Sequence, residues 1–200
     1  MHDFVYYTPT RIIFGKNTEQ QCGGLIKAHN CGKVLIHYGG QSALRSGLVD
    51  RIKASLTAAG LSFVTLGGVV PNPRLSLIRQ GIELARSAEV DFVLAVGGGS
   101  VIDSAKAIAY GAANGGDVWD FYMSLRKPDA CLPIGCVVTI AAAGSEMSSS
   151  TVVTNEENGF KRSFKTDMAR PVFAVMNPEL TLTLPAFQTA CGCVDILMHT

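Results

Sequence analysis

Glycine clusters placed directly after apolar runs are the residues of this sequence best suited to bind a ligand. Because glycine has no Cβ, such clusters let backbone N–H groups come close to a bound group. The clusters are Gly39-Gly40 after Val34–Tyr38, Gly67-Gly68 after Phe63–Leu66, and Gly97-Gly98-Gly99 after Phe92–Val96. A helical pattern follows the third cluster, and a helix N-terminus offers unpaired amides and a partial positive charge. We therefore expect the third cluster to hold the phosphates of a nucleotide. It lacks the G-x-G-x-x-G fingerprint, and a tight structural turn is the alternative.

Ser100 and Asp103 open the helix that follows the third cluster. Their spacing is that of a capping box, in which the acidic side chain reaches back to the N-terminus of the helix. We expect this capping role for Asp103, and direct contact with a ligand is the alternative.

A carboxylate and an imidazole, Asp195 and His199, lie near the end of the sequence. In a helix their spacing places them on one face, where the pair suits a divalent metal. A surface pair is the alternative, and a catalytic site takes about three ligands from the protein. Cys191 would share the face in a longer helix, but Gly192 argues against a helix running through this point.

The spacing of the apolar runs indicates the fold that positions these residues. The runs begin at Val34, Phe63 and Phe92, a regular interval close to the roughly 30 residues of a β-α-β unit. This rhythm predicts an α/β fold with a Rossmann-like, doubly wound parallel sheet. Parallel strands end at a common edge, so the glycine clusters meet at the carboxyl edge, where ligands of such sheets bind.

The remaining segments predict further elements around this sheet. Strands are expected at Val5–Tyr7, Arg11–Phe14, Ile134–Ile140, Val152–Thr154 and Phe173–Met176, with a hairpin-type connection at Asn155–Gly159. Helices are expected over about 18–28 after an Asn17 cap, over 43–59, from the third glycine cluster to about Asn114, and from Pro185 onward. A further helix is expected to start at Asn72-Pro73, with Leu75, Ile78, Ile82 and Ala85 on its apolar face. We expect a nucleotide-binding domain over 1–184 and the start of a helical metal-binding domain over 185–200, which the chain cuts short.

Composition excludes several other classes of protein. The 17 basic and 16 acidic residues nearly balance, which argues against nucleic acid or a membrane surface as a partner. No apolar run approaches the roughly 18 residues of a membrane span, and the first residues lack the features of a secretory signal. The six cysteines are scattered without zinc-type pairs, so we expect reduced thiols in a cytoplasmic protein.

An ordered set of motifs along the whole chain resembles the iron-containing alcohol dehydrogenases, and within them the butanol-dehydrogenase-like, NADPH-using branch. The motifs are Thr8–Gly15, Val70–Pro73, Gly97–Ser100 with Asp103, Gly144–Glu146, and Gly192–Asp195 with His199. The ordered set is far more specific than any one motif. It matches the amino-terminal half of the family pattern.

The resemblance implies a metal, iron or zinc, at the cleft between this nucleotide domain and a following all-helical domain with two further histidine ligands. Asp195 and His199 would be the first two ligands. The metal would act as a Lewis acid on the oxygen of a small alcohol or aldehyde, and the nicotinamide of NADP(H) would exchange a hydride with the substrate carbon. A homo-oligomer, with a dimer expected, is also implied.

The resemblance further implies which residues contact the cofactor. They are Gly39, Gly40 and Ser42 near the adenosine ribose, Asn72 by the adenine, Gly98, Gly99 and Ser100 at the pyrophosphate with Asp103 beside them, and Thr139 and Lys161 around the phosphate and nicotinamide ribose. Arg162 and Lys165 are alternatives to Lys161 as the cation that reaches the cofactor. Ala143 stands where the family usually has threonine, which removes one hydroxyl that would bond the cofactor.

The residue at position 39, a glycine, indicates which of NAD(H) and NADP(H) the protein prefers. NAD-preferring relatives have an aspartate at this place, which binds the ribose hydroxyls and repels a 2′-phosphate. Glycine leaves room and removes the repulsion, so we expect NADP(H). Glycerol-dehydrogenase-like and dehydroquinate-synthase-like enzymes of the same fold are alternatives, and so is a nucleotide-binding chain without catalysis.

Overall fold

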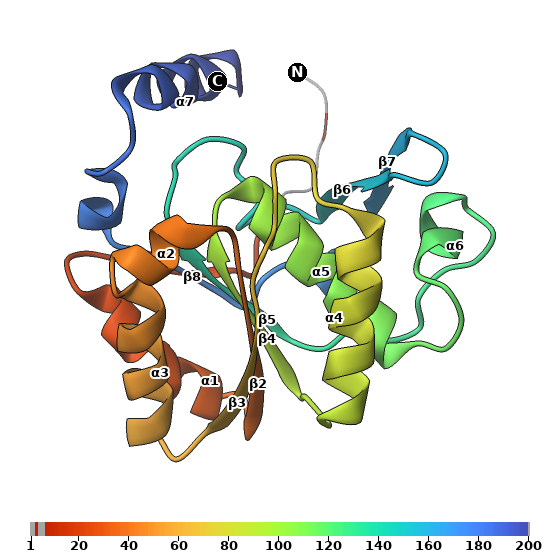
Figure 1. The fold of residues 1–200 in the computed structure, drawn as a ribbon, viewed down its shortest axis with the longest axis horizontal. Coiled ribbons are helices and arrows are strands. Elements are labelled where there is room, and N and C mark those ends of the chain that lie inside the picture. Colours follow the sequence, from red (N-terminus) through yellow and green to blue (C-terminus); the bar gives the residue numbers. More distant parts are fainter. Residues whose placement is uncertain (1–2, 4–6, 200) are drawn as a thin grey trace.

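Apolar strands form the central sheet of the structure (Figure 1). The structure is a computed structural model that describes residue 3 and residues 7–199, with the backbone alone for His199. The strands are β1 (Arg11–Phe14), β2 (Lys33–Tyr38), β3 (Ser62–Leu66), β4 (Phe92–Gly97), β5 (Ile134–Val138) and β8 (Phe173–Met176). They lie in the order β1-β8-β5-β4-β2-β3, and every pairing among them is parallel. The predicted parallel α/β sheet is confirmed.

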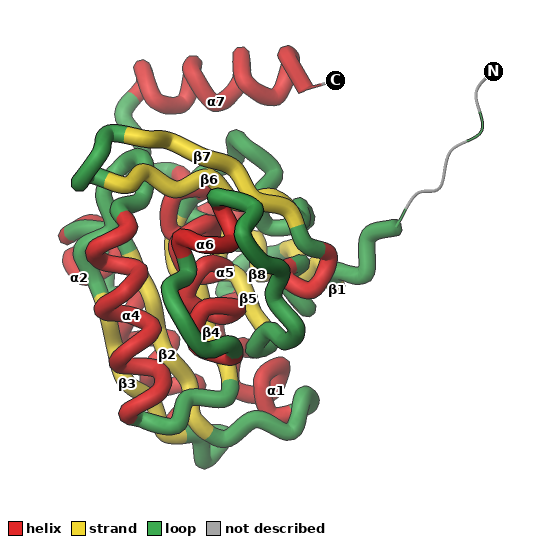
Figure 2. The backbone as a smooth tube through the Cα atoms, turned by 90° about the vertical axis from the view of Figure 1, so that its right-hand side faces the viewer, coloured by secondary structure: helices red, strands yellow, loops and turns green. Residues whose placement is uncertain are grey.

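Helices cover both faces of the sheet, as the doubly wound prediction requires (Figures 1 and 2). One layer contains η1 (Thr18–Gln21), α1 (Cys22–Lys27), α2 (Gln41–Arg45) and α3 (Leu48–Ala58), and the other contains α4 (Leu75–Ser87), α5 (Gly99–Ala113) and α6 (Trp119–Tyr122). Strand β4 is buried along its whole length. Its Val93 and Ala95 pack in the core of the α4–α5 layer, whereas Leu94 and Val96 pack in that of the α1–α3 layer.

The strand order contains one switch point, between β2 and β4. After β2 the chain crosses outward to β3, and it then returns with β4 on the other side of β2. The connections that leave β2 and β4 therefore run in opposite directions and open a crevice between the carboxyl ends of these strands. In open α/β sheets, ligands bind at such a crevice.

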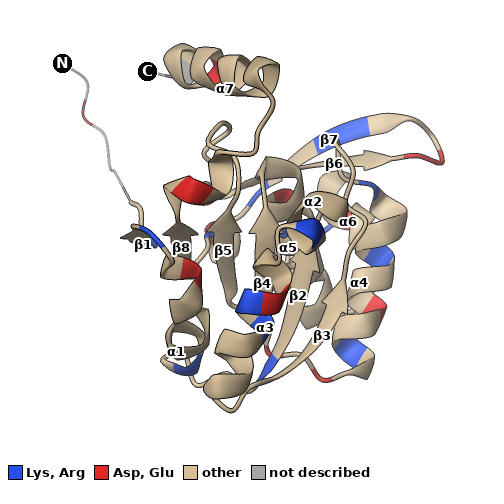
Figure 3. Ribbon diagram, turned by 60° about the vertical axis from the view of Figure 1, so that its left-hand side comes forward, with Lys and Arg blue, Asp and Glu red and all other residues tan. Residues whose placement is uncertain are grey.

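A hairpin and a terminal helix stand beyond the sheet. Strands β6 (Ser150–Asn155) and β7 (Phe160–Lys165) pair antiparallel around the predicted turn at Asn155–Gly159. After η2 (Asp167–Ala169), β8 and η3 (Pro178–Thr181), helix α7 (Ala186–His199) lies beyond the carboxyl ends of the central strands (Figures 1 and 3). The helix expected from Pro185 is therefore confirmed.

Two predicted helices differ from those observed because of local backbone geometry. The segment 43–59 is divided into α2 and α3 at Gly47, which has a left-handed φ of 68°. The segment 18–28 begins as the 3-10 helix η1, and Asn17 makes no side-chain capping bond because it is itself left-handed, with φ 57°.

The start of α4 was predicted wrongly at Asn72-Pro73, and tertiary contacts explain the difference. Asn72 is left-handed (φ 61°), and Arg74 is extended because it bridges to Thr154 of β6. The cap comes from the hairpin, since the Glu156 carboxylate accepts from the Leu75 backbone N–H at 3.0 Å. The predicted apolar face of α4 is confirmed, because all four of its residues are buried.

Gly192 lies inside α7, against the expectation that it would stop the helix. A Cβ at this position would lie 2.8 Å from the carbonyl oxygen of Ala141, so the glycine allows α7 to approach the loop after β5. Cys191, Asp195 and His199 consequently lie at intervals of one helical turn along α7.

Two smaller expectations concern the ends of strands and the membrane. Strand β5 ends at Val138 and not at Ile140, and the strand predicted at Val5–Tyr7 falls largely outside the described residues, with Tyr7 in no strand. Among the described residues, no helix is long and apolar enough to cross a membrane.

Candidate functional site

The first and third glycine clusters meet at the switch point, and the second follows the neighbouring edge strand β3. Gly39 and Gly40 follow β2, and the third cluster joins β4 to α5. A Cβ at Gly39 would lie 3.6 Å from Cγ2 of Val101, so the turn after β2 touches the first turn of α5. The backbone N–H of Thr139, just after β5, donates to the carbonyl of Gly97 at 3.2 Å. Three segments separated in sequence thus form one cradle of small residues at the carboxyl edge.

The N-terminus of α5 is open for an anion. Gly99 and Ser100 are the first helical positions, so their amides have no acceptor within the helix. No side chain caps this end. A Cβ at Gly98 would overlap Cγ2 of Ile140, so only glycine fits beneath the loop after β5. This geometry is suited to phosphate, which would accept from backbone amides at the positive end of the helix dipole.

Asp103 does not have the capping role predicted for it. Its Oδ1 accepts from the Ser145 hydroxyl at 2.7 Å, and its Oδ2 accepts from the backbone N–H of Val152 at 2.9 Å. Asp103 lies one turn into α5, where it faces the segment between β5 and β6 and not the helix terminus. Burial raises the pKa of this carboxyl above its ordinary value, and the two hydrogen bonds oppose the shift.

A cavity of about 500 Å³ adjoins the cradle on the α2–α3 side. Ser42 and Thr139, both predicted cofactor contacts, line it together. Arg51 and Glu19 form an ion pair at 3.0 Å on its wall, and Asn177 donates to the same carboxylate at 3.0 Å. The volume is in the range of small-molecule sites, and the polar groups are few and placed along the walls.

Lys161 and Asn72 form a second polar group, on the opposite layer. The Lys161 ammonium donates to Oδ1 of Asn72 at 2.7 Å. The resemblance places these residues near opposite ends of an extended dinucleotide, whereas the structure brings them into contact. Lys161 lies with Arg162 and Lys165 on β7, which forms a basic strand at the same end of the molecule as α7 (Figure 3).

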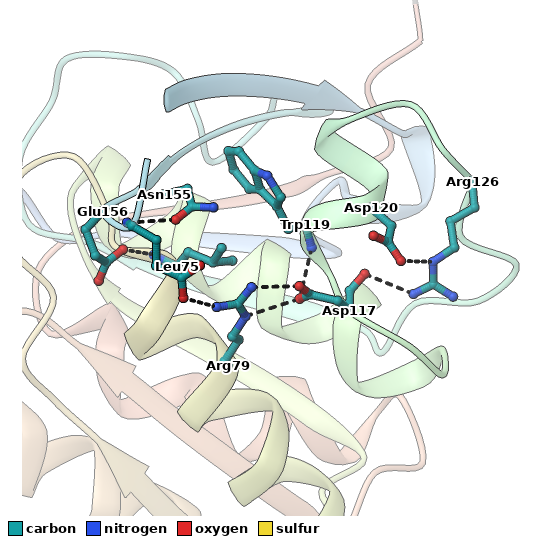
Figure 4. A network of polar contacts seen from close by, with 9 residues as sticks. Leu75, Arg79, Asp117, Trp119, Asp120, Arg126, Asn155 and Glu156 are labelled. Atoms are coloured by element: carbon teal, nitrogen blue, oxygen red, sulfur yellow. Dashed lines mark hydrogen bonds and ion pairs between the residues drawn. The ribbon is translucent and has the colours of Figure 1, made fainter. Parts of the chain in front are cut away.

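Ion pairs fix the hairpin that carries Lys161. Arg79 of α4 pairs with Asp117 at 2.7 Å and with Glu157 of the hairpin turn at 2.8 Å (Figure 4). The Arg79 guanidinium lowers the pKa of Asp117 through its hydrogen bonds. In the same view, Glu156 reaches the first amide of α4. The hairpin is therefore held against α4 along its turn, which fixes the position of the basic strand.

His37 supports the cradle from within the sheet. Its Nδ1 donates to the carbonyl of Leu66 and its Nε2 accepts from the Ser104 hydroxyl, both at 2.8 Å, because a carbonyl can only accept. The ring is completely buried, and burial lowers its pKa to about 4. His37 is thus a packed, neutral histidine just before Gly39.

The pKa of His37 predicts a loss of stability in acid. The unfolded chain binds a proton near pH 6.5 and the folded chain only near pH 4, so the His37 contribution is complete above pH 6.5 and is lost as the pH falls toward 4. At pH 4 we expect this loss to reach about 3 kcal/mol of unfolding free energy. Urea unfolding of wild type and His37→Gln at neutral and acidic pH measures it. The wild type should lose more stability than the variant, and equal losses would contradict the assignment.

The structure places the predicted metal ligands Asp195 and His199 on α7, beyond the crevice. A small pocket separates α7 from the cradle and is lined by Ile140 and Ala141 on one side and by Cys193 on the other. The donor types suit iron or zinc. Among the described side chains, no group of three or more His, Cys, Asp or Glu forms a metal site.

Lys106 is the main polar residue of this region that sequence reasoning missed. It is 0% exposed, and its Nζ contacts oxygen atoms of Ser145, Ser148 and Ser150 at distances from 2.7 to 3.2 Å. The available signal was its spacing, since Asp103 and Lys106 are charged residues three apart in an otherwise apolar helix.

Comparison with known proteins gives the family. Residues 9–178 match the sequence profile described as iron-containing alcohol dehydrogenase. The chain belongs to this family. Within the iron-containing alcohol dehydrogenases it is 44% identical over 200 residues to the probable NADH-dependent butanol dehydrogenase 2 of Bacillus subtilis, and 39% identical over 204 residues to the NADPH-dependent aldehyde reductase YqhD of Escherichia coli. Each alignment covers 100% of this chain and 51% of the relative.

A solved member of the family has the same fold. The crystal structure of NADH-dependent butanol dehydrogenase A from Thermotoga maritima is similar with a TM-score of 0.97 and 41% identity, over 100% of this chain and 50% of that one. The chain therefore spans about half the length of the iron-containing alcohol dehydrogenases that it matches.

Proposed function

We propose that this chain is the nucleotide-binding part of a metal-dependent oxidoreductase that interconverts alcohols and aldehydes or ketones by hydride transfer with NADP(H). The observation that carries the proposal is the cradle at the switch point, where Gly39, Gly98, Ser100 and Thr139 surround an open helix N-terminus. Membership of the iron-containing alcohol dehydrogenases supports the reaction class.

The cradle suggests how the cofactor lies. The pyrophosphate accepts from the amides at Gly99 and Ser100, and the adenosine ribose lies at Gly39, Gly40 and Ser42 with the adenosine directed into the neighbouring cavity. The basic strand takes the nicotinamide end. We place Asn72 there as well, and not by the adenine as the resemblance implies, because Lys161 donates to it. In this arrangement Asp103 supports the cradle through Ser145 and does not contact the cofactor.

The choice of NADP(H) rests on Gly39. Names of relatives do not decide it, because those of the B. subtilis relative and the E. coli relative state NADH and NADPH respectively. A Cβ at Gly39 would make only ordinary contacts, so the absence of a side chain leaves free space beside the ribose. A 2′-phosphate meets no carboxylate at this position.

Asp195 and His199 would hold the metal from one face of α7, with further ligands supplied by the remainder of a full-length family member. A bound iron or zinc would supply Lewis-acid polarisation of the substrate oxygen. The contribution of this chain is to orient the dinucleotide on the side of the cradle next to α7. We place the division between the nucleotide domain and the helical metal domain at residue 184, two residues before α7 begins at Ala186.

A binding titration combined with an assay of aldehyde reduction tests the function. We expect the chain to quench or shift NADPH fluorescence at one saturable site. Turnover of butyraldehyde with ferrous or zinc ions is expected when the chain is joined to the carboxyl-terminal half of the E. coli aldehyde reductase, because the chain covers about half of that relative. NADPH binding without turnover in the fusion would favour a non-catalytic nucleotide-binding protein, and the absence of binding would contradict the proposal.

The state of the cysteines supports the cellular location that we propose for the protein. All six cysteines are free, and burial raises the pKa of Cys22 and Cys131 to about 12, so these thiols are unreactive. We place the protein in the reducing cytoplasm. A homo-oligomer, with a dimer as the simplest form, remains part of the proposal.

A further inference from the structure

The ammonium group of Lys106 is enclosed by the loop between β5 and β6. It contacts the carbonyl oxygens of Ser145 and Ser148 at 2.7 Å and that of Ser150 at 3.1 Å, with the Ser145 hydroxyl at 3.2 Å. A buried ammonium is costly unless such acceptors replace its water. Three of these four acceptors are backbone carbonyls, so the solvation of the Lys106 ammonium depends mainly on the path of the loop backbone.

Asp103 completes this arrangement from the preceding turn of α5. Its carboxylate holds both ends of the same segment, through the Ser145 hydroxyl and the Val152 backbone N–H. Burial lowers the pKa of Lys106 and raises that of Asp103, and the attraction between the two charges opposes both shifts. Asp103 and Lys106 of α5 therefore form a charged pair that holds the 145–152 segment against this helix.

The chain that leads into this segment forms one wall of the cradle. The backbone N–H of Thr139 donates to the carbonyl of Gly97, and Ile140 occupies the space that a side chain at Gly98 would need. Ala143 lies 3.4 Å from the Cβ position of Gly99. The shape of the glycine turn thus depends on the position of the loop, and the loop depends on the charged pair in α5.

We propose that Lys106 is a positioning residue whose buried ammonium group fixes the 139–150 segment against the glycine turn. The position of this segment then sets the affinity for the dinucleotide, so the inference rests on the cofactor site proposed above. Lys106 itself does not touch the cofactor in this proposal. It acts through the backbone of the loop, much as a bound cation organises carbonyl oxygens.

Chemical rescue separates positioning from a merely structural role. Lys106→Ala leaves a space into which methylammonium can bring back the positive charge and its donors, and Lys106→Met retains the packing without the charge. We expect each variant to bind NADPH about tenfold more weakly at a temperature well below its melting point, because hydrogen bonds to a charged group are lost. Added methylammonium should restore the affinity of Lys106→Ala and leave Lys106→Met unchanged. Lys53→Ala, which removes a half-buried lysine of α3 that is distant in sequence from the 139–152 loop, is the matched control.

Amide hydrogen exchange gives a readout that does not need the cofactor. In Lys106→Ala we expect faster exchange across residues 145–152 and recovery of protection with methylammonium. Wild-type affinity and protection in the folded variant would overturn the proposal, and so would a loss that methylammonium does not reverse. If wild type binds no dinucleotide, the proposed function fails, while the exchange result still decides whether Lys106 fixes the loop. Should Lys106→Ala not fold, Lys106→Met and Ser145→Ala provide the same exchange and binding tests, since Ser145 links the two charges.

Discussion

Gly98→Ala is expected to weaken NADPH binding by about a hundredfold. The added Cβ would overlap Cγ2 of Ile140 and would also stand where a phosphate approaches the first amides of α5. The backbone at Gly98 is extended, with φ −93°, so alanine brings no conformational strain and the effect is steric. Overpacking should in addition lower the unfolding free energy by about 1–3 kcal/mol.

Two matched variants separate these contributions. Gly24→Ala, on the exposed side of α1 with open space around the Cβ position, should leave both binding and stability close to wild type. The double variant Gly98→Ala with Ile140→Ala relieves the overlap and should recover stability while binding stays weak. Full recovery of binding in the double variant would show that the loop, and not the phosphate, needs the space at Gly98. Unchanged binding in Gly98→Ala alone would place the dinucleotide elsewhere.

Gly39→Asp is expected to reverse the cofactor preference. A carboxylate beside the ribose repels a 2′-phosphate and accepts hydrogen bonds from a free 2′-hydroxyl, so NADPH should bind about tenfold more weakly and NADH more tightly. The substitution fits the fold, because a Cβ there would lie 3.6 Å from Val101 and 3.7 Å from the carbonyl oxygen of Val69. Parallel titrations with both cofactors measure the ratio.

Gly39→Ala is the control for this experiment. Its neutral methyl group occupies the same position without charge, so the ratio of NADPH to NADH affinity should stay as in wild type. An unchanged ratio in Gly39→Asp would remove Gly39 from the specificity determinants. Tighter binding of NADH than of NADPH by the wild type would contradict the proposed preference directly.

The sheet and the place of the site could be predicted from sequence because both depend on local patterns. Strands buried on two faces give continuous apolar runs, and the regular interval between Val34, Phe63 and Phe92 defines the crossover units. Once the strands are parallel, the glycine turns must share an edge. That reasoning placed Gly39 and Gly98 correctly at one crevice, although no single motif in the sequence carries a dinucleotide fingerprint.

The predictions that were wrong concern helix caps. In these places a residue from a distant segment forms the hydrogen bond that the local sequence had appeared to provide. Asn72 was the natural cap for α4, but Glu156 of the hairpin caps that helix and the chain before it is drawn into a bridge with β6. Asp103 fits a capping box by spacing, yet it binds Ser145 and Val152. In each case the competing partner lies dozens of residues away, so local spacing could not reveal it.

Buried polar groups were the least predictable part of the site. The position of Lys106 in an apolar helix, three residues after Asp103, hints at burial, but its carbonyl partners carry no sequence signal. Gly192 reads as a helix breaker, but the close approach of Ala141 requires a glycine inside α7. The sequence pattern records which residue types are present, whereas these two roles depend on what the tertiary fold places against them.

Amide hydrogen exchange of the wild-type chain with and without saturating NADPH tests whether the dinucleotide binds at the cradle. We expect slower exchange at residues 39–42, 97–102 and 139, the backbone of the cradle between β2, β4 and β5. Exchange in α1, which contributes no residue to the cradle or to the adjoining cavity, should not change. Protection confined to other segments, or no protection at cofactor concentrations that saturate binding, would contradict a dinucleotide site at the switch point.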